Sequence, residues 1–171
     1  SYEWTGDIIV SKFNSNLTTL LASTFIGGSG SDEASTILID QNDDIIIVGA
    51  SQSPNYPTLG GYKNTLSGGM DIIVTKISND LSTLIASTFI GGNGAVPELA
   101  ETALITPSNT IVIGGYSSSS TYPISGNAYQ TTYGGTQDWV LTVLTNNLNN
   151  ILYSTYYGGT GTDRITSIAL D

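Results

Sequence analysis

The sequence predicts an all-β protein, a partial β-propeller built from four-stranded antiparallel blades. Two observations support this fold class. A segment of about 65 residues recurs along the chain, and repeats of this length are typical of units that stack on their neighbours. Each repeat divides into four stretches rich in β-branched and aromatic residues, each the length of one strand. Four antiparallel strands per repeat form the blade of a propeller.

The repeat is clearest in two stretches that follow one another. The segment Asp7–Phe13 (DIIVSKF) returns as Asp71–Ile77 (DIIVTKI) and, more loosely, as Asp138–Leu144 (DWVLTVL). A second shared stretch then ends in a glycine pair, as LTTLLASTFIGG, LSTLIASTFIGG and LNNILYSTYYGG. Such glycines supply the backbone freedom that a sharp bend after a strand requires. The sequence therefore predicts equivalent strands at equivalent places in each copy.

In the middle copy we expect strands at residues 34–40, 44–50, 71–77 and 84–90. The Asx-rich run Asp40–Asp43 is expected to turn the first strand into the second, because short polar side chains mimic the backbone there. Asn79-Asp80 is expected to turn the third strand into the fourth. The connection between the second and third strands is long and carries its own repeated tyrosines, so we expect it to be packed.

The expected organisation is a single domain over residues 1–171. It comprises a half blade (1–30), two blades (31–94 and 95–161) and a lone first strand (162–171). A closed propeller typically needs four to eight blades, so this stretch is not expected to close alone. Two explanations stay open: the chain is a fragment of a longer propeller, which we favour, or copies of it assemble through their open strand edges.

A set of recurring features can be compared with known repeats. They are a Gly-Gly pair, an acidic residue, an apolar strand ending in Asp40, a Tyr-Pro pair and a Gly-Gly-x-Asp strand with Lys76. On these features the whole chain resembles the seven-bladed β-propeller repeat family, often labelled SBBP. The third copy departs from it, since Val143 replaces the lysine. The resemblance implies a secreted or surface-attached protein whose chemistry is largely undefined.

Composition excludes several classes of function. The net charge is −10 with four cationic residues, so a nucleic-acid partner is not expected. No apolar run approaches the length of a membrane span. The chain has no cysteine and no histidine, so thiolate sites and the usual general base near neutral pH are missing. We therefore expect no catalytic residues, no enzyme activity and an extracellular or cell-surface location.

Glu98 and Glu101 lie in the one clear break of the repeat, the segment 95–101. Insertions on one rim of a repeat protein often carry its specific function. Paired carboxylates serve glycoside hydrolysis when held about 5–9 Å apart. The alternative, which we favour, is a short helical turn with solvated acids.

Three acidic residues in one turn, Asp40, Asp43 and Asp44, bring oxygens together, and oxygen ligands suit calcium. The turn lacks the glycine of a calcium loop at its sixth position, where Ile45 stands. We therefore interpret it as a solvated turn, with no cofactor and a calcium site as the minor alternative.

The repeat-equivalent Asp7, Asp71 and Asp138 stand at strand starts. We expect them to cap the preceding turns through backbone N–H groups.

Tyr56 and Tyr122 belong to the repeated Tyr-Pro pairs. Their rings are candidates for stacking on sugars, although such tyrosines more often pack a loop onto its blade. Asn16 begins an N-glycosylation sequon, Asn16-Leu17-Thr18.

The functional hypothesis is a non-catalytic extracellular structural or interaction module. Its partners are copies of itself, forming a ring or filament, or the rest of a longer propeller. The alternative is a fragment of a larger secreted propeller that binds or hydrolyses carbohydrate.

Overall fold

The computed structural model describes residues 6–171, which form ten strands. The strands are β1 (Ile8–Phe13), β2 (Leu20–Ile26), β3 (Asp32–Ile39), β4 (Ile45–Ser51), β5 (Asp71–Ile77), β6 (Leu84–Ile90), β7 (Leu99–Ile105), β8 (Ile111–Ser117), β9 (Asp138–Leu144) and β10 (Ile151–Tyr157). In the middle copy these bounds lie close to the predicted ones. These segments form strands because they are rich in β-branched residues, which pack well on a pleated surface.

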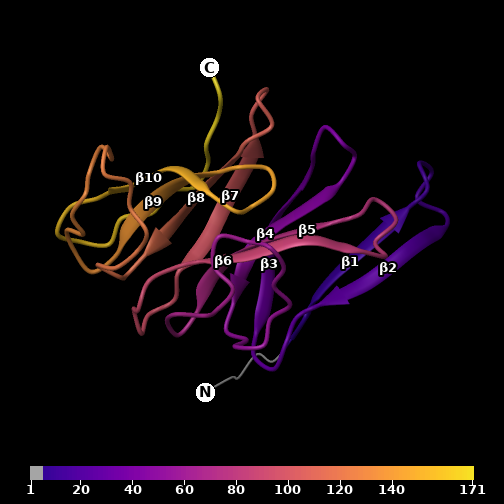
Figure 1. The fold of residues 1–171 in the computed structure, drawn as a ribbon, viewed down its shortest axis with the longest axis horizontal. Coiled ribbons are helices and arrows are strands. Elements are labelled where there is room, and N and C mark those ends of the chain that lie inside the picture. The colour runs from indigo at the N-terminus through magenta and orange to yellow at the C-terminus, as the bar shows by residue number, and fades with distance from the viewer. Residues whose placement is uncertain (1–5) are drawn as a thin grey trace.

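Three antiparallel sheets follow one another along the chain (Figure 1). The first is the hairpin β1–β2, the second has the order β3-β4-β5-β6, and the third has the order β7-β8-β9-β10. Each four-stranded sheet is a simple meander, the arrangement of a propeller blade. The prediction of an all-β partial propeller, with two blades and a half blade of two strands, is confirmed.

The turns between strands have identifiable causes. Oδ1 of Asp40 accepts hydrogen bonds from the amides of Asn42 (2.8 Å) and Asp44 (3.0 Å), forming the predicted Asx turn. In the turns before β6 and β10 the residue with positive φ is a leucine, Leu81 at 63° and Leu148 at 62°. This backbone is uncommon for leucine, but both side chains are buried in a core, so their packing offsets the strain.

The sheets stack face to face through equivalent residues. Between the hairpin and the middle blade, Ile8, Val10 and Ile26 pack against Ile73 and Phe89. Between the middle and third blades the repeat-equivalent residues meet: Ile72, Val74 and Ile90 on one side, Val140 and Tyr156 on the other. Both junctions are therefore the same interface, which explains why these positions recur in the sequence.

The predicted lone strand at 162–171 is wrong in its secondary structure. Thr162 makes one bridge to Gln137, and residues 163–171 form no strand. The physical reason is the pairing pattern, in which each first strand pairs with the second strand of its own blade, β3 with β4 and β7 with β8. Within residues 6–171 no second strand follows Thr162, so this segment lies over the outer face of the third blade instead.

Candidate functional site

Pairs of carboxylates recur at the blade junctions. The first acid of each pair stands at or just before the start of β1, β5 or β9, which is the third strand of its blade or half blade. These first acids are Asp7, Asp71 and Asp138. The second acid lies at the start of the segment that follows the fourth strand, and the second acids are Asp32, Glu98 and Asp163. Both acids approach the glycine that directly follows the fourth strand, where a Cβ atom would collide with both of them. The amide of the next glycine donates to the second acid at 2.8 Å in every junction.

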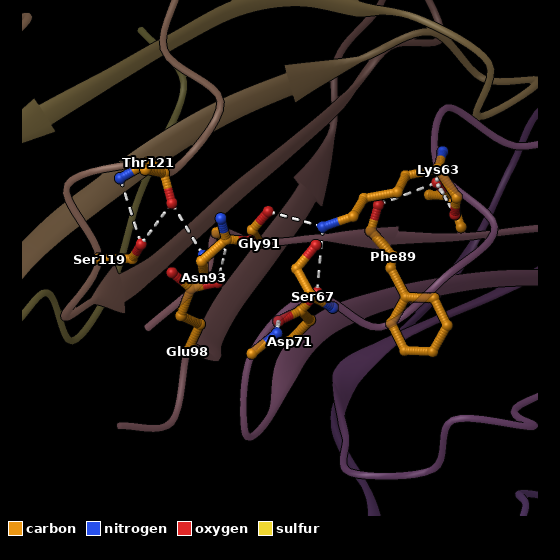
Figure 2. A network of polar contacts seen from close by, with 12 residues as sticks. Lys63, Ser67, Asp71, Phe89, Gly91, Asn93, Glu98, Ser119 and Thr121 are labelled. Carbon is orange, nitrogen blue, oxygen red and sulfur yellow. Dashed lines mark hydrogen bonds and ion pairs between the residues drawn. The ribbon is translucent and has the colours of Figure 1, made fainter. Parts of the chain in front are cut away.

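The middle junction is shown in Figure 2. Oε2 of Glu98 accepts from the Gly92 amide, and Oε1 accepts from the Ser117 hydroxyl at 2.6 Å. Oδ2 of Asp71 accepts from the Ser67 amide at 2.9 Å and lies 3.3 Å from Nζ of Lys63. Oδ1 of Asp71 accepts from the Gly68 amide at 3.2 Å, so every carboxylate oxygen of this pair is hydrogen-bonded, as a buried acid requires.

The capping role expected for Asp71 and Asp138 agrees with this geometry. The amides of Ser67 and Gly68 donate to Asp71, and the Gly134 amide donates to Asp138 at 2.9 Å. These amides belong to the glycine turns that precede β5 and β9. The carboxylates therefore hold the long loop of each blade against its third strand.

Glu98 occupies the position that Asp32 and Asp163 hold in the other two junctions. This equivalence was not predicted from the sequence. The Glu98 amide donates to the Met70 carbonyl at 2.9 Å, as the Asp163 amide does to the Gln137 carbonyl at 2.7 Å. The two extra residues of the 95–101 segment hid this equivalence. The pattern Gly-Gly-x-Gly followed by the first acid would have revealed it.

The structure does not combine Glu98 and Glu101 into one site. Glu98 is 1% exposed within the junction network, whereas Glu101 is exposed and lines a shallow hollow with Glu33 between β3 and β7. The predicted helical turn is also wrong, because residues 95–98 form only bends and irregular loop. No hydrolytic pair is assembled here from these two side chains.

Burial raises the pKa of Glu98 to about 7, although hydrogen bonds from Ser117 and Gly92 lower it. A carboxyl whose pKa is raised in the fold stabilises the protein at low pH and loses that contribution as the pH rises. We expect the free energy of unfolding to fall by about 3 kcal/mol, relative to Glu98→Gln, between pH 4 and pH 8. Denaturant unfolding across this pH range measures the difference.

The exposed Glu101 supplies the control for this pH dependence. Glu101→Gln is the matched variant, because it removes an exposed carboxyl of the same segment that lies outside the junction network. Parallel profiles for the wild type and Glu98→Gln would show that the buried carboxyl does not titrate in this range.

Tyr56 and Tyr122 lie inside the blades. Their side chains are 3% and 4% exposed, and each hydroxyl is 2.9 Å from a threonine hydroxyl, of Thr75 or of Thr142. Burial raises the pKa of both phenols, so both stay protonated at any physiological pH. These rings pack the loops onto the blades and present no face to a ligand.

The acidic turn is held by a lysine from the same blade. Nζ of Lys76 lies 2.6 Å from Oδ2 of Asp40 and 3.3 Å from Oδ2 of Asp44. An ammonium group therefore stands where the calcium hypothesis would place a cation. Asp43 adopts a positive φ of 64° in this turn. Across residues 6–171 no group of three or more acidic side chains is arranged to hold a metal ion.

Asn16 lies in the exposed turn between β1 and β2, accessible as the sequon requires. Its Oδ1 accepts from the neighbouring Ser15 hydroxyl, at 3.1 Å.

Two apolar faces lie at the ends of the stack of sheets, one exposed and one partly covered. The hairpin end face comprises Ile9, Phe13, Leu17 and Phe25, all exposed. The third-blade end face comprises Val112, Trp139, Leu141, Val143 and Tyr157 and is partly covered by residues 164–170. There the ring centroids of Trp139 and Tyr157 lie 4.8 Å apart. The Tyr129 ring stacks on the Tyr157 ring with a centroid distance of 5.5 Å. The sequence analysis missed this cluster, which aromatic residues at aliphatic repeat positions could have indicated.

Comparisons with known proteins add no assignment. The chain matches no family model and no curated protein. Between residues 6 and 171 the structure also contains no helix with the length and apolarity needed to cross a membrane.

Proposed function

We propose that this chain is a non-catalytic structural or interaction module of extracellular or cell-surface proteins, built of repeats related to the SBBP family. Its role is to join blades through its two end faces. Copies of the chain associate head to tail, which gives a ring where the rotation closes and a filament where it does not.

The observation that carries this proposal is the exposure of the hairpin end face. Ile9 is 60% exposed and Phe25 is 70% exposed. Their counterparts in the middle blade, Ile73 and Phe89, are both 0% exposed because the hairpin covers them. The same positions are thus interior wherever a preceding blade is present. A contiguous apolar face of this kind marks an interaction surface.

The opposite end supplies the complementary surface. Trp139, Leu141 and Tyr157 occupy the repeat positions that, at the two internal junctions, pack against the following sheet. The part of the third-blade end face that residues 164–170 leave open can therefore receive the hairpin end face of another copy, by the geometry already used inside the chain. In addition, the edge of β1 away from β2 pairs with no strand in residues 6–171 and is open to main-chain pairing.

The experiment is to measure the mass of the chain by light scattering over a range of concentrations. We expect the wild type to associate and the Ile9→Glu/Phe25→Glu variant to stay monomeric, because two charges replace the apolar contact. Val96→Glu, at an exposed apolar residue outside both end faces, should associate like the wild type. A wild type that is monomeric at every concentration contradicts self-assembly.

A second candidate is a carbohydrate-binding role within a larger propeller. The exposed rings of Tyr129 and Tyr157 beside Trp139 favour it, since aromatic faces supply large contact area at low entropy cost. Glycan-array binding by the monomeric variant would support this role.

A further inference from the structure

The last carboxylate pair differs from the middle one in its positive charge. In the middle junction, Nζ of Lys63 lies 3.3 Å from Asp71 and donates to the Gly91 carbonyl at 2.8 Å. The counterpart of Lys63 in the third blade is Gln130, whose amide nitrogen donates to Asp138 at 3.2 Å. A neutral amide thus takes the place of an ammonium group beside an acidic pair.

One oxygen of this pair has no partner. Asp138 is 0% exposed, and its Oδ1 atom makes no hydrogen bond within residues 6–171. This atom lies 2.7 Å from the position that a Cβ on Gly158 would occupy, and Oδ2 of Asp163 lies 2.9 Å from the same point. The unpartnered oxygen and the second carboxylate therefore both approach the same point beside Gly158.

Such an arrangement is electrostatically incomplete. A buried carboxylate without a counter-charge is costly, and a second carboxylate facing it adds repulsion. The described residues near the pair include one guanidinium, of Arg164, which is held over the Tyr116 ring at 4.7 Å and donates to Gln137. Within residues 6–171 no lysine or arginine forms an ion pair with either acid, so the balancing charge is open to a cation from solution.

We propose that the Asp138–Asp163 junction binds Ca²⁺, which takes the electrostatic place that Lys63 fills in the middle junction. Carboxylate oxygens from both acids are hard ligands of the kind that Ca²⁺ prefers. Asp163 is half-buried and Gly159 is exposed, so water can complete the coordination on that side. With only two carboxylates, the dissociation constant should be on the order of 10⁻⁴–10⁻³ M, as in extracellular calcium modules.

The test is thermal unfolding of the whole chain at pH 7 with CaCl₂ added, at constant ionic strength. Ca²⁺ that binds only the folded state should raise the unfolding midpoint by about 3–10 °C at about 10 mM. Tb³⁺ luminescence excited through the adjacent Trp139 gives a second readout, which Ca²⁺ should reverse.

Lys63 and Gln130 occupy the same position in two blades, so exchanging one for the other provides matched variants. Gln130→Lys should raise the midpoint without calcium and abolish both the calcium shift and the Tb³⁺ signal. Lys63→Gln should lower the midpoint without calcium and enlarge the calcium shift. A calcium response that survives in Gln130→Lys would place the ion elsewhere on this acidic surface and overturn the proposal. The absence of any wild-type response would overturn it too.

Discussion

Replacing Phe89 by alanine is expected to lower the free energy of unfolding by about 3–5 kcal/mol. The ring is 0% exposed, packs against the hairpin and meets the Tyr56 ring edge-on at 5.9 Å. The loss combines the transfer free energy of the ring with the cavity left between two sheets that cannot fully collapse. Denaturant unfolding followed by far-UV circular dichroism measures it.

Phe25 is the matched control, because it occupies the same repeat position in the hairpin. It is 70% exposed, so Phe25→Ala should change stability by less than about 0.5 kcal/mol at concentrations where the chain is monomeric. Equal costs for the two variants would mean that the sheets do not stack as described. A cost for Phe25→Ala that grows with protein concentration would instead indicate that association covers this face.

The strands could be predicted because the sequence repeats them. Ile72, Ile73 and Val74 belong to a stretch that recurs with the same apolar pattern, and the observed β5 has the predicted bounds. Repetition also explains the burial of both faces of this strand, since a blade is covered on either side by its neighbours. Local pattern and global fold agree here, as expected for a foldable sequence.

The site could not be predicted in the same way, because its partners are distant in sequence. Asp71 lies eight residues from Lys63 in its own blade, but it meets Glu98 only after the chain has folded into neighbouring blades. The role of Glu98 was also hidden because two extra residues precede it and because it is a glutamate where the other repeats have aspartate. The unpartnered oxygen of Asp138 has no counterpart in any sequence pattern, since it depends on one missing hydrogen bond.

The end of the chain shows a limit of repetition as a guide. Residues 163–170 have the strand-forming pattern of β3 and β7, yet they form no strand. A strand requires a partner for its backbone groups, and β-propensity mainly measures the fit to a neighbouring strand. Ile165 and Ile168 instead cover Gly114 on the third blade, which satisfies the apolar pattern without a ladder.

Replacing Lys76 by methionine is expected to destabilise the fold by about 3–5 kcal/mol, because it leaves a buried carboxylate without its counter-charge. Nζ of Lys76 is 2.6 Å from Oδ2 of Asp40 and donates at 2.6 Å to Oδ1 of Asn146 in the next blade. Both Lys76 and Asp40 are buried. The lysine therefore joins the acidic turn of one blade to the turn between the last two strands of the following blade.

Lys12 holds the equivalent place in the hairpin and is the natural comparison. Its Nζ contacts Asn79 of the next blade, with no carboxylate within ion-pair distance among the described residues, so Lys12→Met should cost about 1 kcal/mol. The double variant Lys76→Met/Asp40→Asn should recover most of the loss, since the buried charge is removed with its partner. Equal losses for Lys76→Met and Lys12→Met would show that the ion pair adds nothing to the hydrogen bond between blades.

The same ion pair sets the response to acid. Burial opposes ionisation of Asp40, but the hydrogen bonds from Lys76 and from the Asn42 and Asp44 amides outweigh it and hold its pKa below the usual value. A depressed carboxyl pKa stabilises the fold above the unfolded-state pKa and loses that effect as the pH falls through the folded one. Lys76→Met removes the strongest of these bonds, so this variant should unfold at a higher pH than the wild type in an acid titration. If the two midpoints coincide, the turn amides alone keep Asp40 ionised, and the lysine acts only through its contact with Asn146.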